Sequence, residues 1–231
     1  MSFYITGDTH GEFERVVDFC EVNGTTTDDV LVILGDAGIN YYLDRGDILL
    51  KAELSQLPIT LFCIHGNHEQ RPQEIDSYVE KEFLGGIVFY EEAYPNLLFA
   101  KDGEIYDFDG KKTIVIGGAY SVDKYYRIKH REPWFDNEQP SEEIKAYVES
   151  QLEENNWRVD MVFSHAAPRR YEPTWAFIPG LDQSRVDKST EDWLDTIVEK
   201  LDFDKWYAGH YHVESQEGPV TIMFEEFDEI W

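Results

Sequence analysis

The sequence has few cysteines and few basic residues, and it has no long apolar run, repeat or low-complexity linker. Its 231 residues include two cysteines, Cys20 and Cys63, and each lies inside an apolar segment. We therefore expect buried free thiols and not a disulfide framework or a cysteine metal site. Because no run of about 18 apolar residues occurs, no membrane-spanning helix is expected.

The first residues, Met1 to Thr6, contain neither a basic segment nor a small-residue cleavage site. We therefore expect no signal peptide. Together with the expected free thiols, this pattern favours a cytoplasmic location.

Positive charge is scarce, since 20 Lys and Arg residues stand against 47 Asp and Glu residues, for a formal net charge of -27. A charge of that sign repels nucleic acid backbones and anionic membranes, so both are disfavoured as partners. We interpret most of the excess as a solvated acidic surface. An anionic substrate must then be attracted by local positive charge, such as a bound metal ion.

The apolar residues are sufficient for a packed core, because 42% of the chain is hydrophobic and 15% is aromatic. The length suits one core and is short for two domains. Apolar runs predict strands over 2–6, 30–34 and 59–64, with helices over 12–22 and 46–57 between them. The second helix is expected to turn these residues toward the core: Ile48, Leu49, Ala52 and Leu57.

The remainder of the chain predicts short strands and then a second alternation of helices and strands. Asp109-Gly110 is a strong hairpin signal. Long irregular loops are expected over 120–140 and 166–187. A capping box of Ser189 and Asp192 is expected to begin the last helix. The expected strands are 87–90, 97–100, 104–108, 112–117, 159–164, 206–208 and 220–224, and the expected helices start at Ser141 and span 189–201.

Polar side chains follow five of these predicted strands directly. They are Asp8 and His10, Asp36, Asn67 and His68, His165, and His210 and His212. Five of the seven histidines in the chain are in this set, which scattered structural histidines would not produce. In open α/β sheets, ligands bind at the carboxyl ends of the strands.

The donor types indicate what such a cluster binds. Carboxylate, amide and imidazole groups without thiolates suit manganese, iron or zinc, and we favour manganese. The donors are too many for one tetrahedral ion, and a carboxylate such as Asp36 can bridge two. Two ions about 3.5–4 Å apart can hold a shared hydroxide and clamp the oxygens of a phosphoryl group. This chemistry fits hydrolysis of a phosphoester.

The same residues resemble the motifs of a known family. Taken in order, the sequence resembles the five motifs of the calcineurin-like metallophosphoesterases in Asp8-Thr9-His10, Gly35-Asp36, Gly66-Asn67-His68-Glu69, His165 and Gly209-His210-Tyr211-His212. The resemblance implies an α/β fold, a four-layer α/β/β/α sandwich with two central mixed β-sheets. We expect residues 1–231 to form a single domain of this kind, with loop insertions around 120–140 and 166–187.

The resemblance also implies a role for each motif residue. One divalent ion would be held by Asp8, His10 and His212, the other by Asn67, His165 and His210, and Asp36 would bridge the two. His68 would be catalytic and not a ligand. It would stabilise the developing charge on the phosphate or protonate the leaving oxygen.

The match to the protein phosphatase branch of the family is incomplete. That branch has Asp-Arg-Gly shortly after the second motif, whereas here Asp36 is followed by Ala37-Gly38-Ile39-Asn40. Asp44-Arg45-Gly46 comes several residues late, and we expect it to begin a helix. The third motif ends in Glu69, as in that branch. The sequence leaves open which carboxylate orients His68.

Two clusters of basic and aromatic residues are candidates for substrate contacts. Arg169 and Arg170 follow His165 closely and could bind phosphate, or they could pair with surface carboxylates. The basic segment 124–131 is a weaker candidate. We expect four aromatic residues to pack these loops down rather than to stack on substrate: Tyr125, Tyr126, Trp134 and Trp175. We expect His65 to be structural and His130 to lie in a loop.

The leading hypothesis is a dinuclear metal-dependent hydrolase of phosphoesters, a phosphodiesterase or phosphatase whose substrate is small or nucleotide-like. A Ser/Thr-type protein phosphatase is the alternative that the third motif favours and the late Arg45 disfavours. A nuclease is disfavoured by the net charge of -27. A catalytically silent scaffold with the same fold is disfavoured because no predicted ligand is missing.

Overall fold

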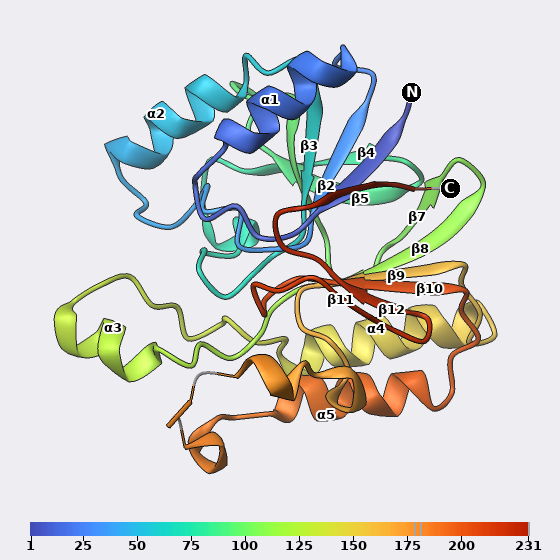
Figure 1. The fold of residues 1–231 in the computed structure, drawn as a ribbon. Coiled ribbons are helices and arrows are strands. Elements are labelled where there is room, and N and C mark those ends of the chain that lie inside the picture. The colour runs from blue at the N-terminus through green and yellow to red at the C-terminus, as the bar shows by residue number, and fades with distance from the viewer. Residues whose placement is uncertain (178, 181, 231) are drawn as a thin grey trace.

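Two β-sheets pack face to face, and helices cover their outer faces (Figure 1). The computed structural model describes residues 1–177, 179–180 and 182–230. Helices α1 (Glu14–Asn23) and α2 (Arg45–Leu54) lie on one sheet, and α4 (Glu142–Glu154) and α5 (Ser189–Val198) lie on the other. The predicted α/β sandwich of four layers is therefore confirmed.

The first sheet has seven strands in the order β13-β1-β2-β3-β6-β5-β4. Its central strands β1, β2, β3 and β6 run parallel. Strands β2 and β3 are buried along their whole length, as continuous apolar runs require when both faces are covered. The strands are β1 (Phe3–Thr6), β2 (Val30–Ile33), β3 (Thr60–Cys63), β4 (Val79–Phe83), β5 (Gly86–Tyr90), β6 (Leu97–Ala100) and β13 (Phe227–Glu229).

The second sheet has six strands in the order β11-β12-β10-β9-β8-β7. Asp109 and Gly110 join β7 to β8 with φ angles of 54° and 82°. Positive φ at both central residues is the backbone of a tight hairpin turn, so that prediction is confirmed. The strands are β7 (Ile105–Phe108), β8 (Lys111–Ile116), β9 (Met161–Ser164), β10 (Lys205–Ala208), β11 (Ser215–Glu217) and β12 (Val220–Ile222).

The core lies in three layers, one between the sheets and one beneath each pair of helices. Between the sheets, aromatic rings of both sheets interlock edge to face, with Phe62 and Phe108 at 5.5 Å and Phe108 and Phe163 at 5.3 Å between centroids. Cys20 and Cys63 are free and buried on the side of α1 and α2. The expectation of buried thiols is therefore confirmed.

Helix α2 turns a different side to the core from the one predicted. Its buried residues are Asp47, Lys51 and Leu54, whereas Ile48 and Leu49 are 56% and 58% exposed. The Asp47 carboxylate is buried because it accepts hydrogen bonds from the backbone N–H groups of the preceding loop. The helix does begin at Asp44-Arg45-Gly46, as predicted, with the Asp44 side chain accepting from the Gly46 N–H at 2.7 Å.

The two predicted loops contain short helices. Residues 120–140 include α3 (Lys124–His130), which stands out from the four layers and places His130 in a helix (Figure 1). Residues 166–187 include three single 3₁₀ turns; 178 and 181, within this stretch, lie outside the described residues. The 3₁₀ turns of the chain are η1 (Pro72–Glu74), η2 (Arg169–Tyr171), η3 (Thr174–Ala176) and η4 (Gln183–Arg185).

Four further details of the prediction were wrong. The capping box of Ser189 and Asp192 does not form, because the Ser189 N–H donates to the Asp187 Oδ1 atom at 3.0 Å and α5 is preceded by Lys188. Strands β4, β11 and β13 were not predicted.

Within the described ranges, none of the helices is both long enough and apolar enough to cross a membrane.

Candidate metal centre

The predicted ligands meet at one edge of the molecule because the parallel strands that deliver them end there. Strands β1, β2 and β3 of the first sheet lead into Asp8, Asp36 and Asn67. Strands β9 and β10 of the second sheet, which are also parallel, lead into His165 and His210. The two sheets therefore bring five distant segments of the sequence to the same place.

The backbone at this edge is strained in a way that aims side chains inward. His10, Asp36, His210 and His212 all have positive φ, between 49° and 70°. Non-glycine residues rarely adopt this conformation, and they do so mostly at functional sites. Glycines provide close approach beside them, since a Cβ on Gly66 would lie 2.0 Å from the Asp36 Oδ1 atom.

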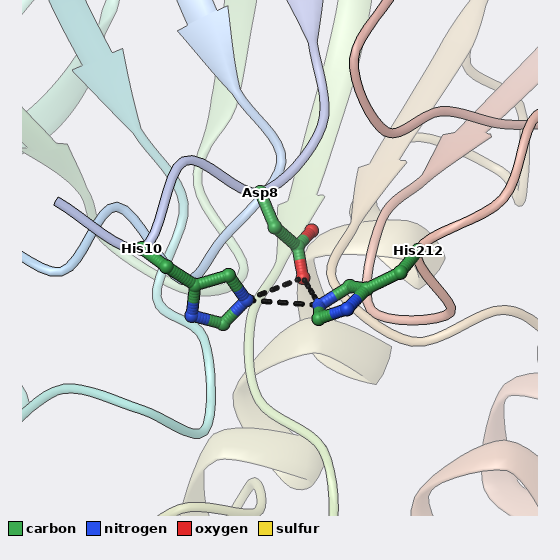
Figure 2. A group of neighbouring side chains, drawn as sticks. All are labelled: Asp8, His10 and His212. Atoms are coloured by element: carbon green, nitrogen blue, oxygen red, sulfur yellow. Dashed lines mark hydrogen bonds and ion pairs between the residues drawn. The ribbon is translucent and has the colours of Figure 1, made fainter. Parts of the chain in front are cut away.

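Asp8, His10 and His212 form the first cluster, and their side chains point toward one another (Figure 2). The His10 and His212 Nε2 atoms are 2.9 Å apart. The Asp8 Oδ2 atom faces them at 3.7 and 3.2 Å, without an aligned hydrogen bond in the described part of the chain. The other carboxylate oxygen of Asp8 accepts from the His210 N–H at 2.9 Å. One buried oxygen is thus left facing two imidazoles.

Asp36, Asn67 and His165 form the second cluster. The His165 Nδ1 atom lies 2.8 Å from the Leu34 carbonyl oxygen, so in the neutral ring Nδ1 donates and Nε2 presents a lone pair. That Nε2 atom lies 2.9 Å from the Asn67 Oδ1 atom and 3.6 Å from the Asp36 Oδ2 atom. The Asn67 amide is oriented by its Nδ2 donating to the Ser121 hydroxyl at 3.0 Å. Acceptors therefore face acceptors, which a cation between them would stabilise.

The charge states of the site favour cation binding. Burial raises the pKa of a carboxylate, but at Asp8 and Asp36 the interactions with the surrounding histidines outweigh burial. They hold the pKa of Asp36 below its usual value and the pKa of Asp8 well below it. Burial lowers the pKa of His210 to about 3, and neighbouring His165 adds to the effect. His210 is therefore a neutral imidazole, the form that binds metals.

His10 behaves differently from His210. Although burial opposes it, the carboxylates of Asp8 and Asp36 raise the pKa of His10 to about 9. A proton on His10 thus occupies the place where a cation would neutralise the same two carboxylates. The donors fit divalent ions in chemistry. They also fit in placement, because the ligating atoms of Asp8, His10 and His212, and those of Asp8, Asp36 and His165, lie within 4.8 Å of one another in each group. The division of the seven ligands between two ions stays a prediction.

His68 lies beside the ligands. Its backbone N–H donates to the Asp36 Oδ1 atom at 2.7 Å. Its ring lies edge to face with His10, at 5.2 Å between centroids, and stacks on Tyr41 at 6.1 Å. The placement suits a group that acts on a phosphate bound next to the metal site.

The carboxylate nearest to the ring of His68 is one that the motifs did not single out. The Asp123 Oδ1 atom lies 4.0 Å from the His68 Nε2 atom and 3.8 Å from the Arg127 Nη1 atom. Arg127 is fully buried and donates to the Ser121 hydroxyl and the Pro133 carbonyl oxygen. Residues 120–140 therefore form part of the site. The basic segment 124–131 was a candidate for substrate contacts, but no pattern in the sequence singled out Asp123.

Arg169 and Arg170 are paired with carboxylates. Arg169 lies 3.0 Å from Glu172, and Arg170 binds Asp195 with two nitrogens and also contacts Glu199. Neither arginine is among the described residues that line the cavities beside the metal site. The arrangement matches the alternative of pairing with carboxylates and does not support the predicted phosphate contact.

The aromatic residues of the loops are less packed than predicted. Tyr125, Tyr126 and Trp175 are 65%, 56% and 71% exposed. Trp134 is half-buried and donates to Glu138, as packing requires. His65 is buried, as expected of a structural residue.

Glu69 supports the loop from inside. Its side chain is fully buried, and its Oε1 atom accepts from the Gly66 N–H at 2.9 Å. Burial and the nearby Asp36 charge raise its pKa to about 8. Glu69 therefore fixes the turn that presents Asn67 and His68.

Comparison with known proteins identifies the family. The sequence profile described as calcineurin-like phosphoesterase matches residues 1–214. No curated protein matches the sequence. Among solved structures, TT1561 of Thermus thermophilus is similar at 10% identity, a TM-score of 0.51 and coverage of 96% of this chain and 89% of that chain. A phosphopantetheinyl hydrolase from Mycobacterium tuberculosis is similar at 14% identity, a TM-score of 0.50 and coverage of 96% of this chain and 88% of that chain.

The two kinds of match carry different weight. Identities this low to solved structures show the fold alone, whereas the family profile spans nearly the whole sequence. The chain belongs to the calcineurin-like phosphoesterase family.

Proposed function

We propose that this chain is a dinuclear metal-dependent hydrolase of phosphoesters, a phosphodiesterase or phosphatase whose substrate is small or nucleotide-like. The observation that supports it best is the pair of clusters in which nitrogen and oxygen atoms able to bind a metal ion lie close together. His165 Nε2 lies 2.9 Å from Asn67 Oδ1, and His10 Nε2 lies 2.9 Å from His212 Nε2. Two cations would satisfy both contacts.

We keep the division of ligands that the family resemblance implies. One ion would be held by Asp8, His10 and His212, the other by Asn67, His165 and His210, with Asp36 between them. Such ions supply Lewis-acid stabilisation of phosphoryl oxygens and a water that is nucleophilic at neutral pH.

The protein's own residues supply the proton and the orientation. His68 is anchored through its backbone by Asp36 and through its ring by Tyr41. It would donate a proton to the leaving oxygen or stabilise the charge on the phosphate. Asp123, at 4.0 Å, would keep the ring in the orientation that this requires.

Four finer points belong to the same proposal. Manganese is the favoured metal among manganese, iron and zinc. The chain is one domain over 1–231, with insertions around 120–140 and 166–187. Nucleic acid is disfavoured as a partner by the charge of -27. The location is cytoplasmic.

The test is hydrolysis of para-nitrophenyl phosphate and of bis(para-nitrophenyl) phosphate by the full chain with added manganese. We expect at least one to be cleaved well above the rate of the His68→Ala variant. Equal rates for the two proteins on both substrates would contradict the proposal.

A further inference from the structure

We propose that the substrate is a phosphodiester with two uncharged, apolar or aromatic substituents, and that Tyr42 helps to bind the second substituent in a cavity of its own. This inference rests on the proposed phosphoesterase function and specifies its substrate class. The geometry that points to it is a metal centre that lies within one cavity and borders a second cavity at His10 and His68.

The two cavities meet at the same pair of residues. One has a volume of about 400 Å³ and lies against the start of α2; we call it the tyrosine cavity, after Tyr41 and Tyr42. The other has a volume of about 500 Å³ and lies on the side of α3 and η4; we call it the lysine cavity, after Lys188. His10 and His68 line both. A phosphate held beside these histidines can therefore extend one substituent into each cavity.

The tyrosine cavity has an aromatic wall and a backbone floor. Tyr41 and Tyr42 lie edge to face at 4.7 Å between centroids, and Leu50 adds an aliphatic surface. Gly11 and Gly38 form part of the lining, and a Cβ on Gly38 would lie 2.5 Å from the Gly11 nitrogen. An aromatic wall over a floor without side chains suits a flat apolar group.

The lysine cavity holds five of the proposed metal ligands on one side. Away from them its wall includes the apolar side chains of Val122, Phe177 and Val213. Lys188 is the one lysine or arginine among the described residues that line either cavity. Its ammonium group is already paired with the buried carboxylate of Glu172, and the Glu191 side chain lies 3.5 Å away.

This distribution of charge separates diesters from monoesters. A monoester dianion places a charged oxygen where a diester carries its second substituent, toward the tyrosine cavity, whose described lining contains Asp47 and no lysine or arginine. A diester has one negative charge, which the metal centre itself would hold, and it ends in two substituents. The cavity walls therefore fit the diester better.

The surface around the cavities is apolar as well. Most of the exposed large apolar side chains in the described residues lie on two segments beside the cavities, 42–49 and 122–128. They are Tyr42, Leu43, Ile48, Leu49, Val122, Tyr125, Tyr126 and Ile128. Exposed apolar groups gathered around a site mark a place where an apolar ligand binds.

The kinetic test keeps the leaving group constant and changes only the second substituent. The manganese-loaded protein is given para-nitrophenyl phosphate, methyl para-nitrophenyl phosphate and phenyl para-nitrophenyl phosphate. We expect kcat/KM to be lowest for the monoester and to rise about tenfold from the methyl to the phenyl diester. Tyr42→Ala should abolish that rise. Val22→Ala is the control, because Val22 is an exposed apolar residue of α1 that lines neither cavity in the described structure and lies outside segments 42–49 and 122–128.

Binding provides a second readout that involves no turnover. Diphenylphosphinate and methyl(phenyl)phosphinate bear the same charge and contain no ester bond. In isothermal titration of the manganese-loaded protein, we expect the diphenyl compound to bind about tenfold more tightly, and Tyr42→Ala to remove the difference.

Each remaining outcome overturns the inference in a distinct way. A monoester cleaved as fast as the phenyl diester would refute the diester class and leave the phosphoesterase function standing. A phenyl preference that persists in Tyr42→Ala would refute the assignment to the tyrosine cavity. If none of the three esters is cleaved and neither phosphinate binds, the proposed function itself fails.

Discussion

Two regions of the molecule differ in burial and in secondary structure. One is the edge where the strands end, and the other is the set of segments that surround this edge. The edge consists of buried residues proposed to bind metal, such as Asp8, Asp36 and His165, fixed by parallel strands and by close glycines. The surrounding segments are 42–49, 120–140 and the described part of 166–187. They contain short helical elements and most of the exposed large apolar side chains of the described residues.

This contrast indicates a division of work. The edge has the donor set for metal ions and for phosphoryl chemistry, which tolerates little change. The surrounding segments have the cavities and the apolar surface, so they are placed to choose the substrate. Changes at the edge should abolish activity, whereas changes in the surrounding segments should alter it by smaller factors.

The largest effect is expected at the carboxylate between the two clusters. Asp36→Ala removes a ligand proposed to be shared by both ions, so kcat/KM should fall by about 10³-fold or more. Bound manganese should fall in parallel. Asp28→Ala, at an exposed position, is the control and should change neither. Full activity in Asp36→Ala would contradict the proposal that the edge residues are needed for activity.

The next effect is expected at His68. His68→Ala should lower kcat by about 10²–10⁴-fold, because general acid–base groups contribute about that factor. Its metal content should stay equal to that of the wild type, since His68 is not a proposed ligand. Loss of metal in this variant would assign His68 to the ligand set instead.

The edge could be predicted from the sequence because its signal is local. A continuous apolar run followed at once by Asp, Asn or His marks the end of a buried strand, as at Asp36 and His165. The parallel pairing of β1, β2 and β3 then brings these ends together. Neither step needs knowledge of the surrounding segments.

The surrounding segments were predicted less well, because their key residues are polar or charged at buried positions. Arg127 is fully buried and anchors α3, yet an arginine gives no apolar periodicity. The start of α2 was predicted, but its buried side was not: Asp47 takes a core position by accepting two backbone hydrogen bonds, which leaves Ile48 and Leu49 exposed.

Strand β4, Val-Glu-Lys-Glu-Phe, lies outside these segments and was missed for a related reason. It is an edge strand whose charged side chains resemble those of a loop.

A moderate effect is expected where the two regions meet, at Asp123. Asp123→Asn removes the charge that faces His68 at 4.0 Å, so kcat should fall about tenfold, as for other residues that orient a functional side chain. The loss should be greater for esters with poor leaving groups, which depend most on a proton from His68. Asp136→Asn, an exposed aspartate in the same segment, is the control. Equal loss for good and poor leaving groups would argue for a purely structural role.

The smallest effect is expected on stability, at Glu191 in α5. Burial raises the pKa of Glu191 to about 7, above the usual value of 4.5. The folded state therefore keeps a proton that the unfolded state loses, and stability falls as the pH rises between these values, by at most about 1.4 kcal/mol per pH unit.

Glu191→Gln should remove this dependence. In urea unfolding of the metal-free protein, the variant should gain stability relative to the wild type between pH 5 and 7 by roughly 1 kcal/mol or more. Glu21→Gln, on the exposed side of α1, should leave the dependence unchanged. An identical pH profile in Glu191→Gln and the wild type would show that Glu191 ionises normally.

The central claim is that the ends of the strands hold two metal ions, and metal stoichiometry tests it most directly. The purified full chain is loaded with manganese, freed of excess metal by desalting and analysed by elemental mass spectrometry. The account predicts about two manganese ions per chain, and a marked loss in Asp36→Ala. Less than one ion per wild-type chain after loading would contradict it.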